Sequence, residues 1–134
     1  MGDARHTGSC LCGAVAFELD GPLDGVSYCH CTQCRKMTGH HLASTQAEAK
    51  DLHFSEDRGL KWFRSSDFAE RGFCGECGST LFWRADGRSD LSIAIGIIDG
   101  ATGLSGGHHI FCADKGDYYN LADGLPAYDI LPPR

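Results

Sequence analysis

The chain has 134 residues, of which 42% are hydrophobic and 22% charged, a balance typical of a soluble globular protein. We expect a single domain over residues 1–134, because this length can bury one modest core. The formal net charge of −6 argues against a nucleic-acid-binding surface, which needs a basic field. No apolar run approaches the roughly 20 residues of a membrane helix, and the N-terminus lacks an apolar signal core. We therefore expect a cytoplasmic protein that binds neither nucleic acid nor a membrane.

Most of the chain is predicted to form short strands separated by turn residues. Apolar residues alternate with small or polar ones at 14–19 and, most clearly, at 90–98, which predicts strands there. Further strands are expected at 26–31, 59–65, 80–84, 109–113 and 118–121. The segment 42–54 fits either a helix or a strand, and 32–37 has room for one helical turn. This pattern predicts a mainly β domain.

Seven of the eight cysteines fall in three compact clusters. The clusters have the spacings C-x-C, C-x-C-x-x-C and C-x-x-C, and they consist of Cys10 and Cys12; Cys29, Cys31 and Cys34; and Cys74 and Cys77. Disulfides are one interpretation, but the chain shows no secretion signal, and cysteines of adjacent turns suit one shared ion better than separate bridges. The spacing therefore predicts metal binding.

The central cluster supplies three sulfur ligands from a very short segment. In an extended strand, Cys29 and Cys31 point to the same side, so both can reach one ion. Cys31 and Cys34 have the spacing of a zinc knuckle. Three thiolates occupy three corners of a tetrahedral ion, and catalytic zinc sites keep the fourth corner for water or substrate. This open corner is the reason to suspect an enzyme.

The spacing leaves two ways to divide the sulfurs between metal sites. In one, Cys31, Cys34, Cys74 and Cys77 form an ordinary two-knuckle zinc ribbon that leaves three clustered cysteines unused. In the other, Cys10, Cys12, Cys74 and Cys77 close a structural site, and the central three hold an ion of their own. The second division is favoured because it uses every clustered sulfur.

The three cysteine motifs together resemble one known family. Gly8-Ser9-Cys10-Leu11-Cys12-Gly13, the stretch from Cys29 to Lys36, and Phe73 to Ser79 are similar to the motifs of the glutathione-dependent formaldehyde-activating enzymes, a family that includes centromere protein V. His109-Ile110-Phe111 and Asp123-Gly124-Leu125-Pro126 look like its C-terminal signature. The resemblance implies a zinc-stapled β-tent, two antiparallel sheets leaning together as in the suppressor of Rab nucleotide exchange. It also implies two zinc ions per chain, in the second of the two divisions.

The resemblance further implies a carbon–sulfur lyase that makes or cleaves S-(hydroxymethyl)glutathione from glutathione and formaldehyde. The candidate catalytic residues are then Cys29, Cys31, Cys34, His30 and Arg35. Arg35 and its neighbour Lys36 follow the three thiolates directly and could offset their charge. His30 should face away from the metal in an extended strand, where it acts either in acid–base chemistry or in support of the ligands. The alternative function is a zinc-stapled binding module without catalysis, to which Cys29 would be of no use.

Overall fold

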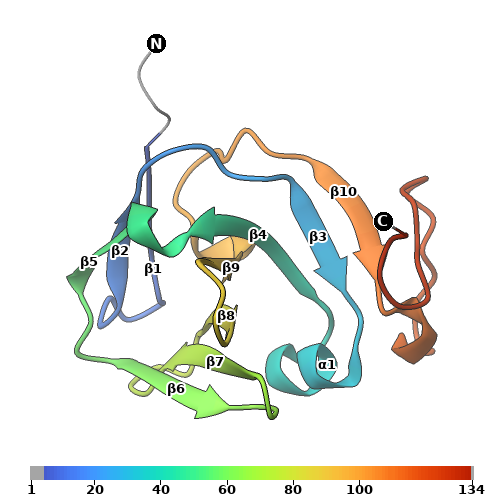
Figure 1. The fold of residues 1–134 in the computed structure, drawn as a ribbon, viewed down its shortest axis with the longest axis horizontal. Coiled ribbons are helices and arrows are strands. Elements are labelled where there is room, and N and C mark those ends of the chain that lie inside the picture. Colours follow the sequence, from blue (N-terminus) through green and yellow to red (C-terminus); the bar gives the residue numbers. More distant parts are fainter. Residues whose placement is uncertain (1–4, 134) are drawn as a thin grey trace.

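The structure is a computed structural model that describes residues 5–133. Residues 1–4 and 134 lie outside the described range. The two ends of the domain expected over 1–134, and most of the N-terminal segment expected to lack a signal core, therefore lie outside the described residues. Within the described residues the strands form two sheets (Figure 1). The smaller sheet has the order β1-β2-β5, with β1 at His6–Ser9, β2 at Ala16–Leu19 and β5 at Leu52–Glu56.

The larger sheet has the strand order β10-β3-β4-β9-β8-β7-β6. Its strands are β3 (Val26–Cys29), β4 (Leu42–Glu48), β6 (Leu60–Arg64), β7 (Ala69–Cys74), β8 (Thr80–Ala85), β9 (Asp90–Ala94) and β10 (Gly106–Ile110). The helical segments of the described chain are α1 (Thr32–Thr38) and the short 3-10 turns η1 (Ala49–Asp51), η2 (Ile95–Ile97) and η3 (Cys112–Asp114). The predicted mainly β fold with two sheets is confirmed.

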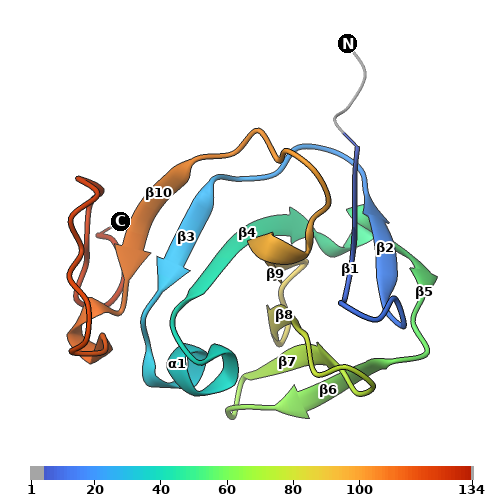
Figure 2. The ribbon, with the colours of Figure 1, turned by 180° about the vertical axis from the view of Figure 1, so that it is seen from behind.

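The larger sheet is strongly curved, and the smaller sheet stands at one end of it (Figures 1 and 2). Neighbouring strands are antiparallel except β10 and β3, which run parallel. The segment 42–54, which fits helix or strand by sequence, divides into β4, the turn η1 and the start of β5. It therefore carries the chain from the large sheet into the small one.

The core lies between the two sheets and comes from the inward faces of their strands. In β2 the buried residues alternate with less buried ones, so Phe17 and Leu19 both point inward. They meet Phe82 and Ile93 of the large sheet, and the rings of Phe17 and Phe82 pack edge to face with centroids 5.7 Å apart. Each such buried side chain contributes about 1.5–3 kcal/mol to folding. This packing fixes the sheets against each other and so positions the loops at their ends.

Several of the predicted strands are wrong in extent or kind. The strand expected at 26–31 ends at Cys29, and Cys31 instead caps the N-terminus of α1. The strand expected at 90–98 ends at Ala94, because the chain turns through η2 to reach the small sheet, where Ile98 bridges Gly8. The strand expected at 109–113 is β10, which ends before Phe111, a residue with a left-handed φ of 56°. The segment 118–121 is not a strand: Tyr118 lies in a turn, Tyr119 follows it, and their hydroxyl groups contact His40 and His30, respectively. Strands β1 and β7 were not predicted.

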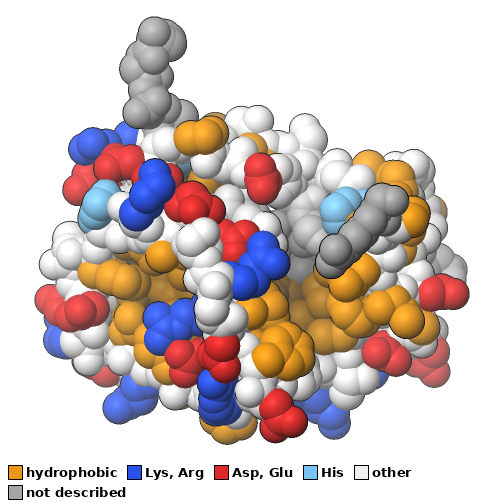
Figure 3. Space-filling view, viewed as in Figure 1, with side chains coloured by type: hydrophobic (Ala, Val, Ile, Leu, Met, Phe, Trp, Pro, Cys, Tyr) orange, Lys and Arg blue, Asp and Glu red, His pale blue; other side chains and the backbone are white. Residues whose placement is uncertain are grey.

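The surface of the described chain carries charges of both signs. On the face drawn in Figure 3, acidic and basic side chains are interspersed, and hydrophobic side chains gather in the hollows between them. Among residues 5–133, no helix combines the length and the apolar character needed to cross a bilayer.

Candidate metal centres

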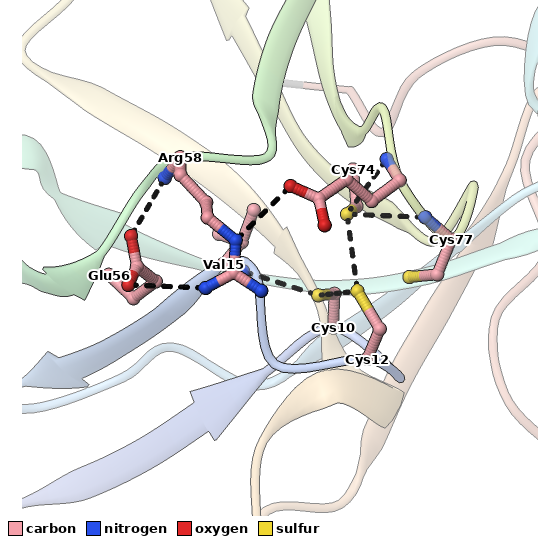
Figure 4. A network of polar contacts seen from close by, with 8 residues as sticks. Cys10, Cys12, Val15, Glu56, Arg58, Cys74 and Cys77 are labelled. Atoms are coloured by element: carbon pink, nitrogen blue, oxygen red, sulfur yellow. Dashed lines mark hydrogen bonds and ion pairs between the residues drawn. The ribbon is translucent and has the colours of Figure 1, made fainter.

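Four sulfurs from two distant turns meet beside the small sheet (Figure 4). Cys10 and Cys12 come from the turn between β1 and β2, Cys74 is the last residue of β7, and Cys77 lies in the turn that leads to β8. All four sulfurs lie within 4.8 Å of one another, with 3.7 Å between Cys10 and Cys12 and 3.8 Å between Cys12 and Cys74. A tetrahedral ion with zinc–sulfur bonds of about 2.3 Å needs sulfurs about 3.8 Å apart. The four side chains therefore fit a zinc ion.

Backbone N–H groups point at these sulfurs and stabilise their charged form. The amide of Val15 donates to Cys10 Sγ at 3.3 Å, and the amides of Glu76 and Cys77 each donate to Cys74 Sγ at 3.4 Å. The pKa of Cys77 is lowered to about 5, chiefly by hydrogen bonds from the side chain and backbone of Ser79. Because metals bind thiolates rather than thiols, these donors prepare the site for an ion.

The four-sulfur cluster ties the two sheets together. Cys12 and Cys74 are 62 positions apart, yet their sulfurs nearly touch. Next to them the Gly59 amide donates to the Ala14 carbonyl at 3.0 Å, and the Gly75 amide donates to the Gly59 carbonyl at 2.7 Å. An ion held here would close a long loop of the chain and would have no free corner, as in structural zinc sites.

Three further sulfurs meet at the junction of β3 and α1. Cys29 is the last residue of β3, Cys31 caps the N-terminus of α1, and Cys34 lies in the first turn of the helix. The Cys31 sulfur accepts from the Cys34 amide at 3.4 Å, which is the hydrogen bond of a knuckle. All three sulfurs lie within 4.8 Å of one another. The helix ends at Gly39, whose φ of 86° is in the left-handed region that glycine adopts without strain.

The three neighbouring sulfurs shift one another's pKa values. The pKa of Cys31 is lowered to about 2, because the Cys29 and Cys34 side chains donate hydrogen bonds to its sulfur. The pKa of Cys29 is raised by the same contacts. A bound divalent ion would hold all three sulfurs as thiolates.

A buried cation lies against this cluster. Arg71 of β7 is 4% exposed, and both of its terminal nitrogens lie 3.7 Å from Cys34 Sγ. One of them also donates to Gln33 Oε1 at 3.3 Å. The sequence gives no sign that Arg71 contacts the sulfurs, because only the tertiary packing of β7 against α1 brings it there.

The two cations that follow the cluster in sequence have other surroundings. Arg35 donates from its guanidinium to the carbonyl of Asp114 at 3.3 Å, and Lys36 is exposed. Arg35 thus fastens the segment after β10 to the helix. Among these three cations, Arg71 is the one whose charged group contacts a sulfur of the cluster.

His30 is completely buried and starts a chain of hydrogen bonds. Its Nδ1 contacts the Tyr119 hydroxyl, and its Nε2 lies 2.8 Å from His109 Nδ1. His109 Nε2 lies 2.8 Å from Asp123 Oδ2. Burial, and then the nearby His41, lower the pKa of His30 to about 4, so the imidazole is neutral at physiological pH. Its ring packs against His41, His109 and Tyr119, as an extended strand that aims Cys29 the other way would place it.

A family model and a curated relative match most of the chain. The family model for the glutathione-dependent formaldehyde-activating enzyme matches residues 5–114, which include all seven clustered cysteines. The chain belongs to this family. An uncharacterized lyase of Schizosaccharomyces pombe is 29% identical over 127 residues, covering 94% of this chain and 92% of the yeast protein.

One solved structure shares the fold of this family member. A crystal structure of a Rhodobacter sphaeroides protein has a TM-score of 0.60 and 23% sequence identity, and the match covers 72% of this chain and 91% of that one. Of the C-terminal residues that resembled the family signature, His109 lies within the matched range of the family model, whereas Asp123 lies beyond it. Tyr119, which bonds to His30, is also beyond that range.

Proposed function

We propose that this chain is a zinc-dependent carbon–sulfur lyase-like enzyme that forms or cleaves S-(hydroxymethyl)glutathione. The observation that carries the proposal is the three-sulfur cluster of Cys29, Cys31 and Cys34, which stands apart from a complete four-sulfur cluster. A protein that used zinc only as a staple would have no need of it. The family match and the lyase name of the yeast relative support the reaction class.

The two clusters would hold one zinc ion each. In the four-sulfur cluster the ion would be structural, and in the three-sulfur cluster one coordination position would remain for a ligand. Zinc, when bound, favours the deprotonated form of a thiol and acts as a Lewis acid. In the forward reaction the glutathione sulfur bonds to the formaldehyde carbon, and the thiol proton ends on the former carbonyl oxygen. The reverse reaction breaks that carbon–sulfur bond and returns the proton to sulfur.

The protein residues around the three sulfurs would orient the ligands and attract the substrate. Both ring nitrogens of His30 are hydrogen-bonded inside the protein, so we propose that it fixes the strand that carries Cys29 and Cys31. Arg35, in the middle of α1, would attract the carboxylates of an anionic thiol such as glutathione. We further propose that residues 1–134 act as one domain in the cytoplasm, where glutathione is abundant.

The experiment that tests this function has two parts. Cobalt-substituted protein is titrated with glutathione, and we expect a new thiolate-to-cobalt charge-transfer band that is absent in Cys34→Ser. Exchange between formaldehyde and its glutathione adduct is then followed by NMR exchange spectroscopy, and the zinc-loaded protein should accelerate it. A protein that binds glutathione without accelerating exchange, or that does neither with its metal present, would be a binding module or an enzyme for another thiol.

A further inference from the structure

The negative charge of the three-sulfur cluster opposes the binding of an anionic fourth ligand. A divalent ion bound by three thiolates carries one net negative charge, and a thiolate as fourth ligand would make it two. Each added negative charge makes the next anionic ligand bind less readily. A site that accepts a substrate thiolate therefore needs a nearby positive charge that is not screened by water.

Arg71 is placed to supply this charge. Its side chain is 4% exposed, so its guanidinium acts in a poorly solvated region where charge interactions are strong. Both terminal nitrogens are 3.7 Å from Cys34 Sγ, while Nε is buried with no partner among the described residues. None of the ion pairs found within residues 5–133 includes Arg71. The thiolate cluster is thus the negative charge that this cation contacts.

A buried cation without a counter-ion is costly, so its position needs an explanation. Uncompensated burial of a guanidinium destabilises a protein strongly, and buried arginines are normally paired with carboxylates. In this protein the sulfurs of the cluster take the place of the carboxylate, because both terminal nitrogens of Arg71 contact Cys34 Sγ. N–H donors to a thiolate also draw charge from its sulfur, which leaves the bound metal more electrophilic.

We propose that Arg71 is a positioning residue that neutralises the three-sulfur cluster through Cys34 and so allows the metal there to accept an anionic sulfur as fourth ligand. The proposal rests on the part of the proposed function in which the cluster holds a metal, and not on glutathione or formaldehyde. It assigns this task to Arg71 rather than to Arg35, whose guanidinium bonds to the Asp114 carbonyl.

The test compares an anionic and a neutral ligand. Cobalt-substituted parent, Arg71→Gln and Arg71→Lys proteins are titrated with 2-mercaptoethanol and, separately, with imidazole, and the visible spectrum is recorded. We expect Arg71→Gln to weaken thiolate binding by about 10-fold or more, with imidazole affinity changed less than about threefold. Arg71→Lys should restore part of the thiolate affinity, because it keeps the charge but loses the fork of donors.

Arg84→Gln is the matched control. Arg84 lies on the neighbouring strand β8, pairs with Glu70 at 2.7 Å and covers the Trp62 ring at 3.6 Å, so its removal changes the net charge equally without touching the sulfurs. Equal losses for thiolate and imidazole in Arg71→Gln, or equal thiolate affinities in Arg71→Gln and Arg84→Gln, would overturn the proposal. If Arg71→Gln does not fold, Arg71→Met replaces it, and thiolate affinity no better in Arg71→Lys than in Arg71→Met would overturn it equally.

Because the probe is a simple thiol, this result is independent of the proposed reaction. A parent protein that binds 2-mercaptoethanol but does not accelerate formaldehyde exchange would contradict the lyase function and leave the role of Arg71 intact. A parent protein that binds no thiol at all, with both metals shown present, would contradict both.

Discussion

His30 Nε2 lies 2.8 Å from His109 Nδ1, a contact that joins the residue between Cys29 and Cys31 to β10, the strand that pairs with β3. The direction of this hydrogen bond follows from its far end. The Asp123 carboxylate can only accept, so His109 Nε2 donates to it, and His109 Nδ1 accepts from His30 Nε2. His30 Nδ1 is then free to accept from the Tyr119 hydroxyl. One exposed carboxylate thereby selects the tautomers of two buried rings.

We predict that Asp123→Asn lowers the free energy of unfolding near neutral pH. The two oxygens of Asp123 accept from His109 Nε2 and from the Leu125 amide, and asparagine has only one acceptor oxygen to offer. The Leu125 amide first, and then His109, lower the pKa of Asp123 below its ordinary value of 3.8. The stabilisation is therefore fully present above pH 3.8 and is lost as the pH falls through the lower, folded-state pKa.

The measurement is denaturant unfolding of parent and Asp123→Asn proteins at a series of pH values. Their difference should be constant from about pH 5 to 8 and shrink only in stronger acid. A difference that instead grows between pH 7 and 5 would mean that the carboxylate pairs with a protonated imidazole, contrary to these tautomers. Asp20→Asn is the control, because Asp20 contacts His53 and Arg5 on the surface, where such pairs contribute little.

We predict two zinc ions per chain, held with unequal affinity. The four-sulfur cluster supplies every ligand of a tetrahedral ion, and the three-sulfur cluster lacks one. Elemental analysis of freshly purified protein should give two equivalents of zinc. A mild chelator should first remove the ion of the three-sulfur cluster, without unfolding the protein. A single tight zinc whose amount is unchanged in Cys29→Ser would refute the two-site assignment. It would favour instead the two-knuckle ribbon formed by Cys31, Cys34, Cys74 and Cys77.

We predict that the two clusters contribute very differently to stability. Cys10→Ser or Cys77→Ser should lower the unfolding free energy by about 2–4 kcal/mol, as expected for opening a long closed loop. Cys34→Ser should cost less, because its cluster joins residues of one strand end and one helical turn. Melting temperatures of the metal-loaded proteins provide the comparison, and equal losses in all three variants would contradict this division.

We predict that Gly59→Ala loosens the metal in the four-sulfur cluster, whereas Gly75→Ala does not. A Cβ on Gly59 would lie 2.9 Å from Cys74 Sγ and 2.8 Å from the Ala14 Cβ, so a ligand would have to move. Such overpacking costs about 1–3 kcal/mol. A Cβ on Gly75 would instead meet the flexible, exposed side chain of Lys61, which can turn away. Zinc retention under a chelator distinguishes the two variants, and equal retention would contradict the prediction.

The parts of the site that sequence reasoning could predict are those built from local spacing. Cys29, Cys31 and Cys34 lie together because a strand end and one helical turn bring them together, and both are visible in the sequence. The contact between His30 and His109 and that between Cys34 and Arg71 were not predictable. Both depend on which distant strands become neighbours in the fold. Likewise the alternation of Ile93, Ile95 and Ile97 predicts one long strand, but the crossing to the small sheet ends it at Ala94.

The parallel pairing of β10 with β3 has a consequence for how the protein is made. Chains emerge from the ribosome N-terminus first, at about 5–20 residues per second. Cys29, Cys31 and Cys34 are therefore outside the ribosome well before Cys77 completes the other cluster, and β10 and Tyr119 follow last. Throughout that interval, three closely spaced thiols are exposed to cellular metal ions and oxidants without the strand that later covers the His30 side. Metal ions and oxidants thus compete for these thiols during translation, before the fold is complete.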